Sequence, residues 1–304
     1  MHAIALYLYS LLHFLSSTAA TTPPYTRTDY FLLNCGSSSN ATSQDGHSWN
    51  GDTTSSPSTA TQQDSSVTDI PFLTTLIFTS KFTYTFLVFC GPKFIRLYFY
   101  PATYLNVDRS KSYFSVTAAN YTLLTNFSAF LTVSALVPQQ SRLVKEFILS
   151  VRDTQKLDIT LNPSPNSYAF INGIEVVSIP NNIYMKGNLN PIPLVVSQQS
   201  FYIDNNNALE TLYQLNVDGN KMLGWCLTLR SQFGTLTTHR NYIAPATVYT
   251  TARTMGKDPN VNLKYNLTWI FTVDSGFWYL ARLHCCEFQQ EVTTGYERCG
   301  DVYF

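Results

Sequence analysis

The sequence has 304 residues, only 12% of which are charged, and its 19 basic residues balance 19 acidic ones to a formal net charge of zero. A typical soluble protein is about 25% charged. Proteins that bind nucleic acid cluster lysine and arginine to neutralise phosphates, whereas the basic residues here are scattered, so no nucleic-acid partner is expected.

The N-terminal segment carries an apolar run from Ile4 to Leu15, followed by small residues that end at Ala20. This order is typical of a signal peptide, residues 1–20, that is cleaved after Ala20. The run is shorter than the roughly 20 residues that span a bilayer, and no later apolar stretch reaches that length. We therefore expect a secreted or extracellular chain.

Two further features agree with the secretory pathway. The chain holds four acceptor motifs for N-glycosylation, at Asn40, Asn120, Asn126 and Asn266, which predict an extracellular glycoprotein. It also has six cysteines, some of which are expected to form disulfides, although about 15 pairings are possible and the spacing does not choose among them. No cysteine spacing matches a zinc site, so neither a metal nor a cofactor is expected.

The first part of the chain changes character near Ile70. Residues 37–68 are rich in Ser, Thr, Asn, Gln and Gly, which predicts a long surface loop, with Trp49 as its anchor to the domain or, alternatively, as a ligand platform. Short aromatic and β-branched runs follow, separated by Gly, Pro and Asn, as in a β-sandwich. We expect strands at Phe82–Phe89, Phe94–Tyr100, Tyr113–Ala118, Tyr121–Asn126, Leu143–Val151, Leu157–Leu161 and Phe170–Pro180.

The second half of the chain repeats the first. Residues 91–100 (GPKFIRLYFY) are echoed by residues 276–286 (GFWYLARLHCC), which aligns Arg96 with Arg282. A repeat of roughly 185 residues is too long for a solenoid unit and indicates a duplicated domain. The predicted organisation is a first domain at 29–180, a linker at 181–200, a second domain at 201–292 and a tail at 293–304.

Several segments carry a resemblance to a known family: residues 29–36 (DYFLLNCG), 96–101 (RLYFYP), 121–124 (YTLL), 169–175 (AFINGIE), 208–216 (ALETLYQLN), 241–245 (NYIAP) and 248–256 (VYTTARTMG). In this order they resemble the tandem malectin-like ectodomain of plant receptor kinases of the FERONIA, THESEUS and HERCULES type. The resemblance implies an all-β fold, with two tandem malectin-like β-sandwich domains of jelly-roll-like form.

The resemblance also implies partners. They are a pectin-like cell-wall polysaccharide or oligosaccharide, a secreted alkalinisation peptide and a glycosylphosphatidylinositol-anchored co-receptor. The chain departs from the family pattern at Thr293, and the transmembrane helix and kinase domain of the family have no counterpart in it. We therefore expect the second domain to be incomplete.

A sugar site needs aromatic faces and hydrogen-bonding groups, usually on loops at one end of a sandwich. Tyr100 and Tyr104, at and just beyond a strand end, are the candidates in the first domain, and Glu287 is the candidate in the second. Alternation along the strand also allows these tyrosines to pack in the core. Arg96 and Arg282 lie in apolar runs, and an arginine buried there must find a carboxylate or several carbonyls.

No catalytic motif is present: the sequence has no nucleophile elbow, no phosphate-binding glycine loop and no kinase signature. We expect a non-enzymatic module that recognises carbohydrate or another ligand for a cell-wall-sensing receptor kinase. The alternatives are a secreted, shortened isoform that acts as a ligand decoy, and a module that docks a neighbouring receptor without binding sugar. The chain as given is expected to be extracellular, or at the plasma membrane if a full-length receptor continues beyond it.

Overall fold

The computed structural model describes residues 25–54, 59–64, 67–104, 107–152, 155–181, 183–184, 192–193, 200–201, 203, 206–216, 248, 258, 260, 264, 266 and 268–283. The predicted signal peptide, most of the predicted second domain, Glu287 and the tail at 293–304 lie outside these residues. Among the described residues, no helix combines the length and the apolar character needed to cross a membrane.

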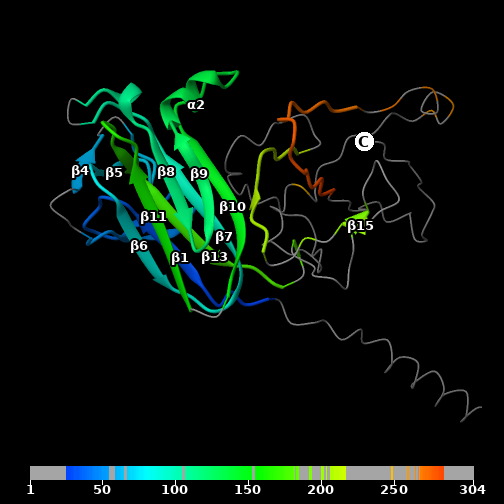
Figure 1. The fold of residues 1–304 in the computed structure, drawn as a ribbon, viewed down its shortest axis with the longest axis horizontal. Coiled ribbons are helices and arrows are strands. Elements are labelled where there is room, and N and C mark those ends of the chain that lie inside the picture. Colours follow the sequence, from blue (N-terminus) through cyan, green and yellow to red (C-terminus); the bar gives the residue numbers. More distant parts are fainter. Residues whose placement is uncertain are drawn as a thin grey trace, which may run out of the picture.

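Nearly all regular elements among the described residues are strands, which confirms the all-β prediction. Figure 1 shows them as a sandwich with helix α2 at one end. The elements are β1 (Tyr30–Asn34), β2 (Ala41–Thr42), β3 (Ser48–Gly51), β4 (Thr59–Gln63), β5 (Thr74–Phe78), β6 (Phe82–Leu87), β7 (Gly91–Phe99), η1 (Arg109–Lys111), β8 (Phe114–Ala118), β9 (Tyr121–Phe127), α2 (Ala129–Ala135), β10 (Leu143–Val151), β11 (Lys156–Pro163), β12 (Ala169–Ile171), β13 (Gly173–Ser178), β14 (Ile192–Pro193), β15 (Ser200–Phe201) and β16 (Leu209–Glu210).

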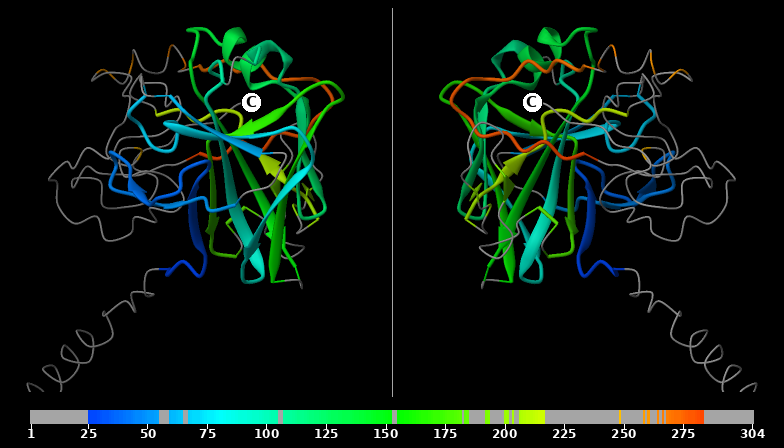
Figure 2. Two further views of the ribbon diagram at one scale, coloured as in Figure 1. Left: turned by 90° about the vertical axis from the view of Figure 1, so that its left-hand side faces the viewer. Right: turned by 90° about the vertical axis from the view of Figure 1, so that its right-hand side faces the viewer.

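Two sheets form the main layers of the sandwich, which Figure 2 shows from two sides. The larger has seven strands in the order β16-β10-β7-β13-β1-β3-β2, and the other has four in the order β6-β11-β8-β9. A third sheet, β12-β5-β4, lies beside them. Strand β7 is central because β10 and β13 pair with its two edges, both antiparallel.

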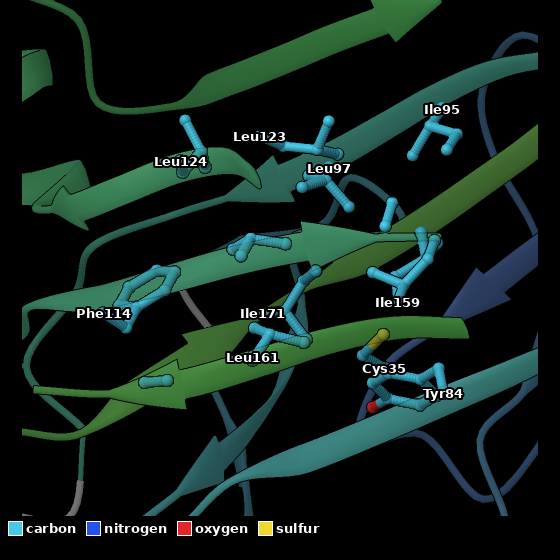
Figure 3. Close-up of a cluster of buried hydrophobic side chains, with 14 of the residues drawn as sticks. Cys35, Tyr84, Ile95, Leu97, Phe114, Leu123, Leu124, Ile159, Leu161 and Ile171 are labelled. Carbon is cyan, nitrogen blue, oxygen red and sulfur yellow. The ribbon is translucent and has the colours of Figure 1, made fainter. Parts of the chain in front are cut away.

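The core forms because apolar residues alternate along the strands, as the period of two in a pleated strand requires. In β6, Tyr84 and Phe86 point inward while Thr83 and Thr85 are exposed. Figure 3 shows side chains of the two main sheets meeting in one apolar cluster. Ile95 and Leu97 of β7, Phe114 of β8, and Ile159 and Leu161 of β11 are among its members.

The polar segment 37–68 is not only a loop, because β2 and β3 lie within it and β4 follows them. Trp49 of β3 is 3% exposed, and its ring meets that of Tyr98 edge-on with the ring centroids 5.2 Å apart. The expectation that Trp49 anchors this segment to the domain is confirmed. Backbone pairing thus orders a segment whose composition alone is typical of a loop.

Arg96, which is only partly buried, has the carboxylate partners that its position demands. Its Nη1 lies 2.8 Å from Oε1 of Glu175 on β13, and its Nε donates to Oε2 of Glu146 on β10. Tyr98 donates to the other oxygen of Glu175 at 2.9 Å. Burial lowers the pKa of Arg96, but the two carboxylates outweigh this effect and raise it above its ordinary value.

The strand β16 follows the predicted linker in the chain, yet it extends the large sheet of the first domain. Leu209 and Glu210 pair with Ile148 and Phe147 at the free edge of β10, and the Thr211 hydroxyl donates to Glu146 at 2.8 Å. In contrast, the described segment 268–283 contains no strand, and its side chains are exposed. Residues that open the predicted second domain therefore complete a sheet of the first.

Candidate ligand-binding site

A hollow of about 300 Å³ lies at one end of the sandwich, where β7 ends beside α2. Figure 1 shows α2 at this end, above the strands. The lining residues come from four separate parts of the chain: Tyr100, Pro101, Ala102, Arg109, Phe130, Val133, Ser134, Gln139, Gln140 and Ser141. They combine aromatic rings with a guanidinium group, amides and hydroxyls.

The wall that carries Tyr100 is held by a buried network. Asn172 is 0% exposed, and it lies where the chain passes from β12 of one sheet to β13 of another. Its Oδ1 accepts the backbone N–H of Tyr100 at 2.7 Å, and its Nδ2 donates to the carbonyl of Thr74 at 2.8 Å. A side chain with this many partners rigidifies the segment that follows β7.

Tyr104 belongs to the same network rather than to the surface. The residue is 2% exposed, its ring centroid lies 5.7 Å from that of Phe170, and its hydroxyl donates to the carbonyl of Tyr100. Asn172 Nδ2 donates to this hydroxyl at 3.3 Å, and burial raises the pKa of Tyr104 above its ordinary value. In this structure the ring of Tyr104 is therefore inaccessible to a sugar, whereas Tyr100 is half-buried and lines the hollow.

A short 3₁₀ turn contributes a charged residue to the lining of the hollow. Asp108 begins η1 by accepting the backbone N–H of Ser110 at 2.9 Å, and the Ser110 hydroxyl donates to the same oxygen at 2.7 Å. These hydrogen bonds lower the pKa of Asp108. The turn presents Arg109, whose guanidinium carbon lies 4.7 Å from the centroid of the Phe130 ring on α2.

Helix α2, which the sequence analysis did not predict, supplies another part of the lining. Ser128 begins the helix, and its side chain accepts the backbone N–H of Leu131. This arrangement is a standard N-cap and is the one local signal that could have located the helix. Phe130, Val133 and Ser134 of α2 line the hollow.

The remaining predicted sites stand as follows. The four sequon asparagines, Asn40, Asn120, Asn126 and Asn266, are all exposed, as glycosylation requires. Glu287 lies outside the described residues. Among the described residues, no group of three or more His, Cys, Asp and Glu side chains is placed to hold a metal ion.

The hollow has the chemistry of a binding site for a polar ligand. A half-exposed tyrosine offers a face for the C–H surface of a pyranose ring, and amides and hydroxyls suit its hydroxyl groups. Arg109 adds a charge that fits a carboxylate. The lining residues include no carboxylate, whereas glycoside hydrolysis uses a pair of them.

These features define an all-β domain with a hollow at one end of its sandwich. Residues 33–304 match the family model of the malectin-like domain, and the chain belongs to this family. The matched range takes in both predicted domains and the residues 293–304 that the sequence analysis treats as a tail.

Two relatives from Arabidopsis thaliana illustrate the match. The chain is 39% identical to the receptor-like protein kinase FERONIA over 330 residues, which are 95% of this chain and 36% of FERONIA. It is 37% identical to the receptor-like protein kinase ANXUR1 over 295 residues, covering 84% of this chain and 34% of ANXUR1. The chain thus spans about a third of the length of these curated relatives.

Solved structures place the match in the extracellular part of such receptors. A crystal structure of the plant receptor-like kinase FER has 39% sequence identity and a TM-score of 0.65, covering 82% of this chain and 71% of that one. The extracellular domain of ANXUR2 from Arabidopsis thaliana has 34% identity and a TM-score of 0.68, covering 82% and 72%. The chain therefore corresponds to the malectin-like ectodomain of FERONIA-like receptor kinases and not to their kinase domain.

Proposed function

We propose that the chain is the extracellular ligand-recognition part of a plant receptor that monitors the cell wall, and that its hollow binds a saccharide. The observation that carries this proposal is the juxtaposition of Tyr100, Arg109, Gln139 and Gln140 around one cavity. The ring of Tyr100 packs against a pyranose, and the amides exchange hydrogen bonds with its hydroxyl groups. Arg109 favours an acidic, pectin-like oligosaccharide over a neutral one.

A second candidate ligand is a secreted peptide held together with a co-receptor. The observation that favours it is the similarity to the FER chain in a crystal structure of the plant peptide RALF23 in complex with FER and LLG2. The identity is 37% and the TM-score 0.66, over 83% of this chain and 72% of that one. In this reading a secreted alkalinisation peptide and a glycosylphosphatidylinositol-anchored co-receptor are the partners. Of the two alternatives, a secreted decoy competes for the same ligands, and a module that only docks a neighbouring receptor binds no sugar.

Titration calorimetry of the purified chain with oligogalacturonides and with neutral cello-oligosaccharides tests the saccharide proposal. Replacing Arg109 by Gln is expected to lower the affinity for the acidic oligosaccharide about tenfold, equivalent to about 1.4 kcal/mol. The affinity for the neutral oligosaccharide should not change. Tyr100→Ala is expected to lower the affinity for both oligosaccharides. The matched control is Lys81→Gln, which removes one exposed positive charge outside the hollow.

Either of two results would contradict the saccharide proposal: no binding of either sugar, or binding that Tyr100→Ala and Arg109→Gln leave intact. A chain that binds no sugar but binds an alkalinisation peptide together with a co-receptor would favour the second candidate.

A further inference from the structure

Strand β9 is an edge strand without the usual protection. It is the last strand of the sheet β6-β11-β8-β9, and among the described residues β8 is its one strand partner. Edge strands expose backbone N–H and C=O groups that can pair with a second chain, and proteins commonly block them with charged side chains or proline. The residues of β9, YTLLTNF, include neither.

The sequence places a glycosylation acceptor at each end of this strand. Asn120 lies in the turn between β8 and β9, and Asn126 is the penultimate residue of β9. The six residue steps between them span roughly 20 Å, given about 3.3 Å per residue in a strand. Two glycans at this separation bracket the whole edge.

The local geometry presents both acceptors to solvent. Asn120 and Asn126 are exposed, and Asn126 has a left-handed backbone with φ of 45° that turns the chain at the strand end. The Ser164 hydroxyl donates to Oδ1 of Asn126 at 3.0 Å, so the amide nitrogen that carries the glycan is directed away from that contact. The third residue of the first motif, Thr122, is also exposed.

We propose that N-linked glycans at Asn120 and Asn126 shield the β9 edge and keep it from pairing with a second copy of this chain. A glycan is bulky and hydrated, so it replaces the charged side chains that the strand lacks. The β8–β9 register is irregular near Val116. Such an irregularity twists the edge, which also hinders pairing with a second chain. The inference is independent of what the hollow binds.

Variants that differ only in the position of the lost glycan test this proposal. Thr122→Ala removes the first acceptor motif, and Asn126→Gly removes the second with a residue that accepts a positive φ. Ser128 is left unchanged because it caps α2. The control is Thr42→Ala, which removes the motif at Asn40 from another exposed strand position. The double variant is expected to associate, as measured by light scattering after size exclusion, while the control stays monomeric.

A charge at the same place should substitute for the sugar. Thr122→Lys removes the same acceptor motif as Thr122→Ala but adds an edge lysine, so combined with Asn126→Gly it is expected to remain monomeric. Enzymatic removal of glycans from the folded, secreted chain gives the same test without a folding step, and association is expected there too. The proposal is overturned if mass spectrometry finds Asn120 and Asn126 unmodified, or if the deglycosylated chain stays monomeric at matched concentration.

Discussion

Strand β7 and the segment 276–283 carry the same sequence pattern, but only the first of them forms a strand. In β7 most residues of the pattern are buried, and the strand is paired on both edges. The described echoing residues are exposed and lie outside any strand. The two arginines follow suit: Arg96 bridges two carboxylates, while Arg282 donates to the carbonyl of Ile183 at 2.9 Å and lies over the Tyr184 ring. An apolar pattern becomes a strand only where neighbouring strands satisfy its backbone.

The largest expected difference concerns the aligned arginines. Arg96→Met leaves Glu146 and Glu175 close together without a cation, and is expected to destabilise the fold by about 3–5 kcal/mol. Arg282→Met removes one partly buried hydrogen bond and a ring contact from an exposed residue. It is expected to lower the free energy of unfolding by about 1 kcal/mol or less. Urea unfolding followed by circular dichroism measures both. Equal losses in the free energy of unfolding would mean that Arg282 contributes as much to the stability of the fold as Arg96.

A pair of isoleucines, one in β7 and one in the wider described segment 268–283, isolates the contribution of apolar burial. Ile95 of β7 is 0% exposed and Ile270 is 92% exposed. Ile95→Ala is expected to cost about 2–5 kcal/mol because it leaves a cavity in the core. Ile270→Ala should change the free energy of unfolding by less than about 0.5 kcal/mol. A large loss at Ile270 would show that this segment is packed in solution.

Two tyrosines inside the sandwich distinguish a satisfied polar group from an unsatisfied one. Tyr104 and Tyr168 both pack on Phe170, but the buried hydroxyl of Tyr168 has no hydrogen-bond partner among the residues that the structure describes. Burial raises the pKa of Tyr168 to about 12. Tyr104→Phe is expected to cost about 1–3 kcal/mol and to speed hydrogen exchange at the Tyr100 amide. Tyr168→Phe should be neutral or slightly stabilising in the same assay, and a reversed order would contradict this assignment of the network.

The smallest expected effect appears at alkaline pH. Burial raises the pKa of Cys35 above its ordinary value of 9.0 and raises those of Tyr84 and Tyr98 above 10.0. The folded state holds these protons more tightly than the unfolded state. Their contribution to stability is therefore complete below about pH 9 and is lost as the pH rises further. Melting temperatures measured between about pH 8 and pH 11 should fall, and Tyr84→Phe should flatten the fall whereas Tyr213→Phe, at an exposed site, should not.

Alternation revealed most of the sandwich from sequence. The expected strand Leu143–Val151 coincides with β10, and the expected Phe82–Phe89 contains β6. The expected Phe170–Pro180 is instead divided between β12 and β13, because the buried Asn172 turns the chain from one sheet to another. A single apolar run conceals such a crossing, and only the partners of Asn172 reveal it.

The hollow was harder to foresee. Its lining comes from residues near 100, 109, 130 and 140, which no local spacing connects. Tyr100 was found because it stands at a strand end, but the same reasoning selected Tyr104, whose ring turns inward to Phe170. Arg109 and Phe130 escaped notice because the turn and the helix that carry them are too short to leave a clear periodicity.

The pairing of β16 with β10 is expected to be the first part of the sandwich to unfold locally. Thr211 meets Glu146 across 65 positions of the chain, so this contact carries the loop-closure entropy of the whole intervening segment. The strand itself spans only Leu209–Glu210. It is therefore expected to join last during folding and to detach first by local unfolding, while β7 exchanges its amide hydrogens only when the whole domain unfolds.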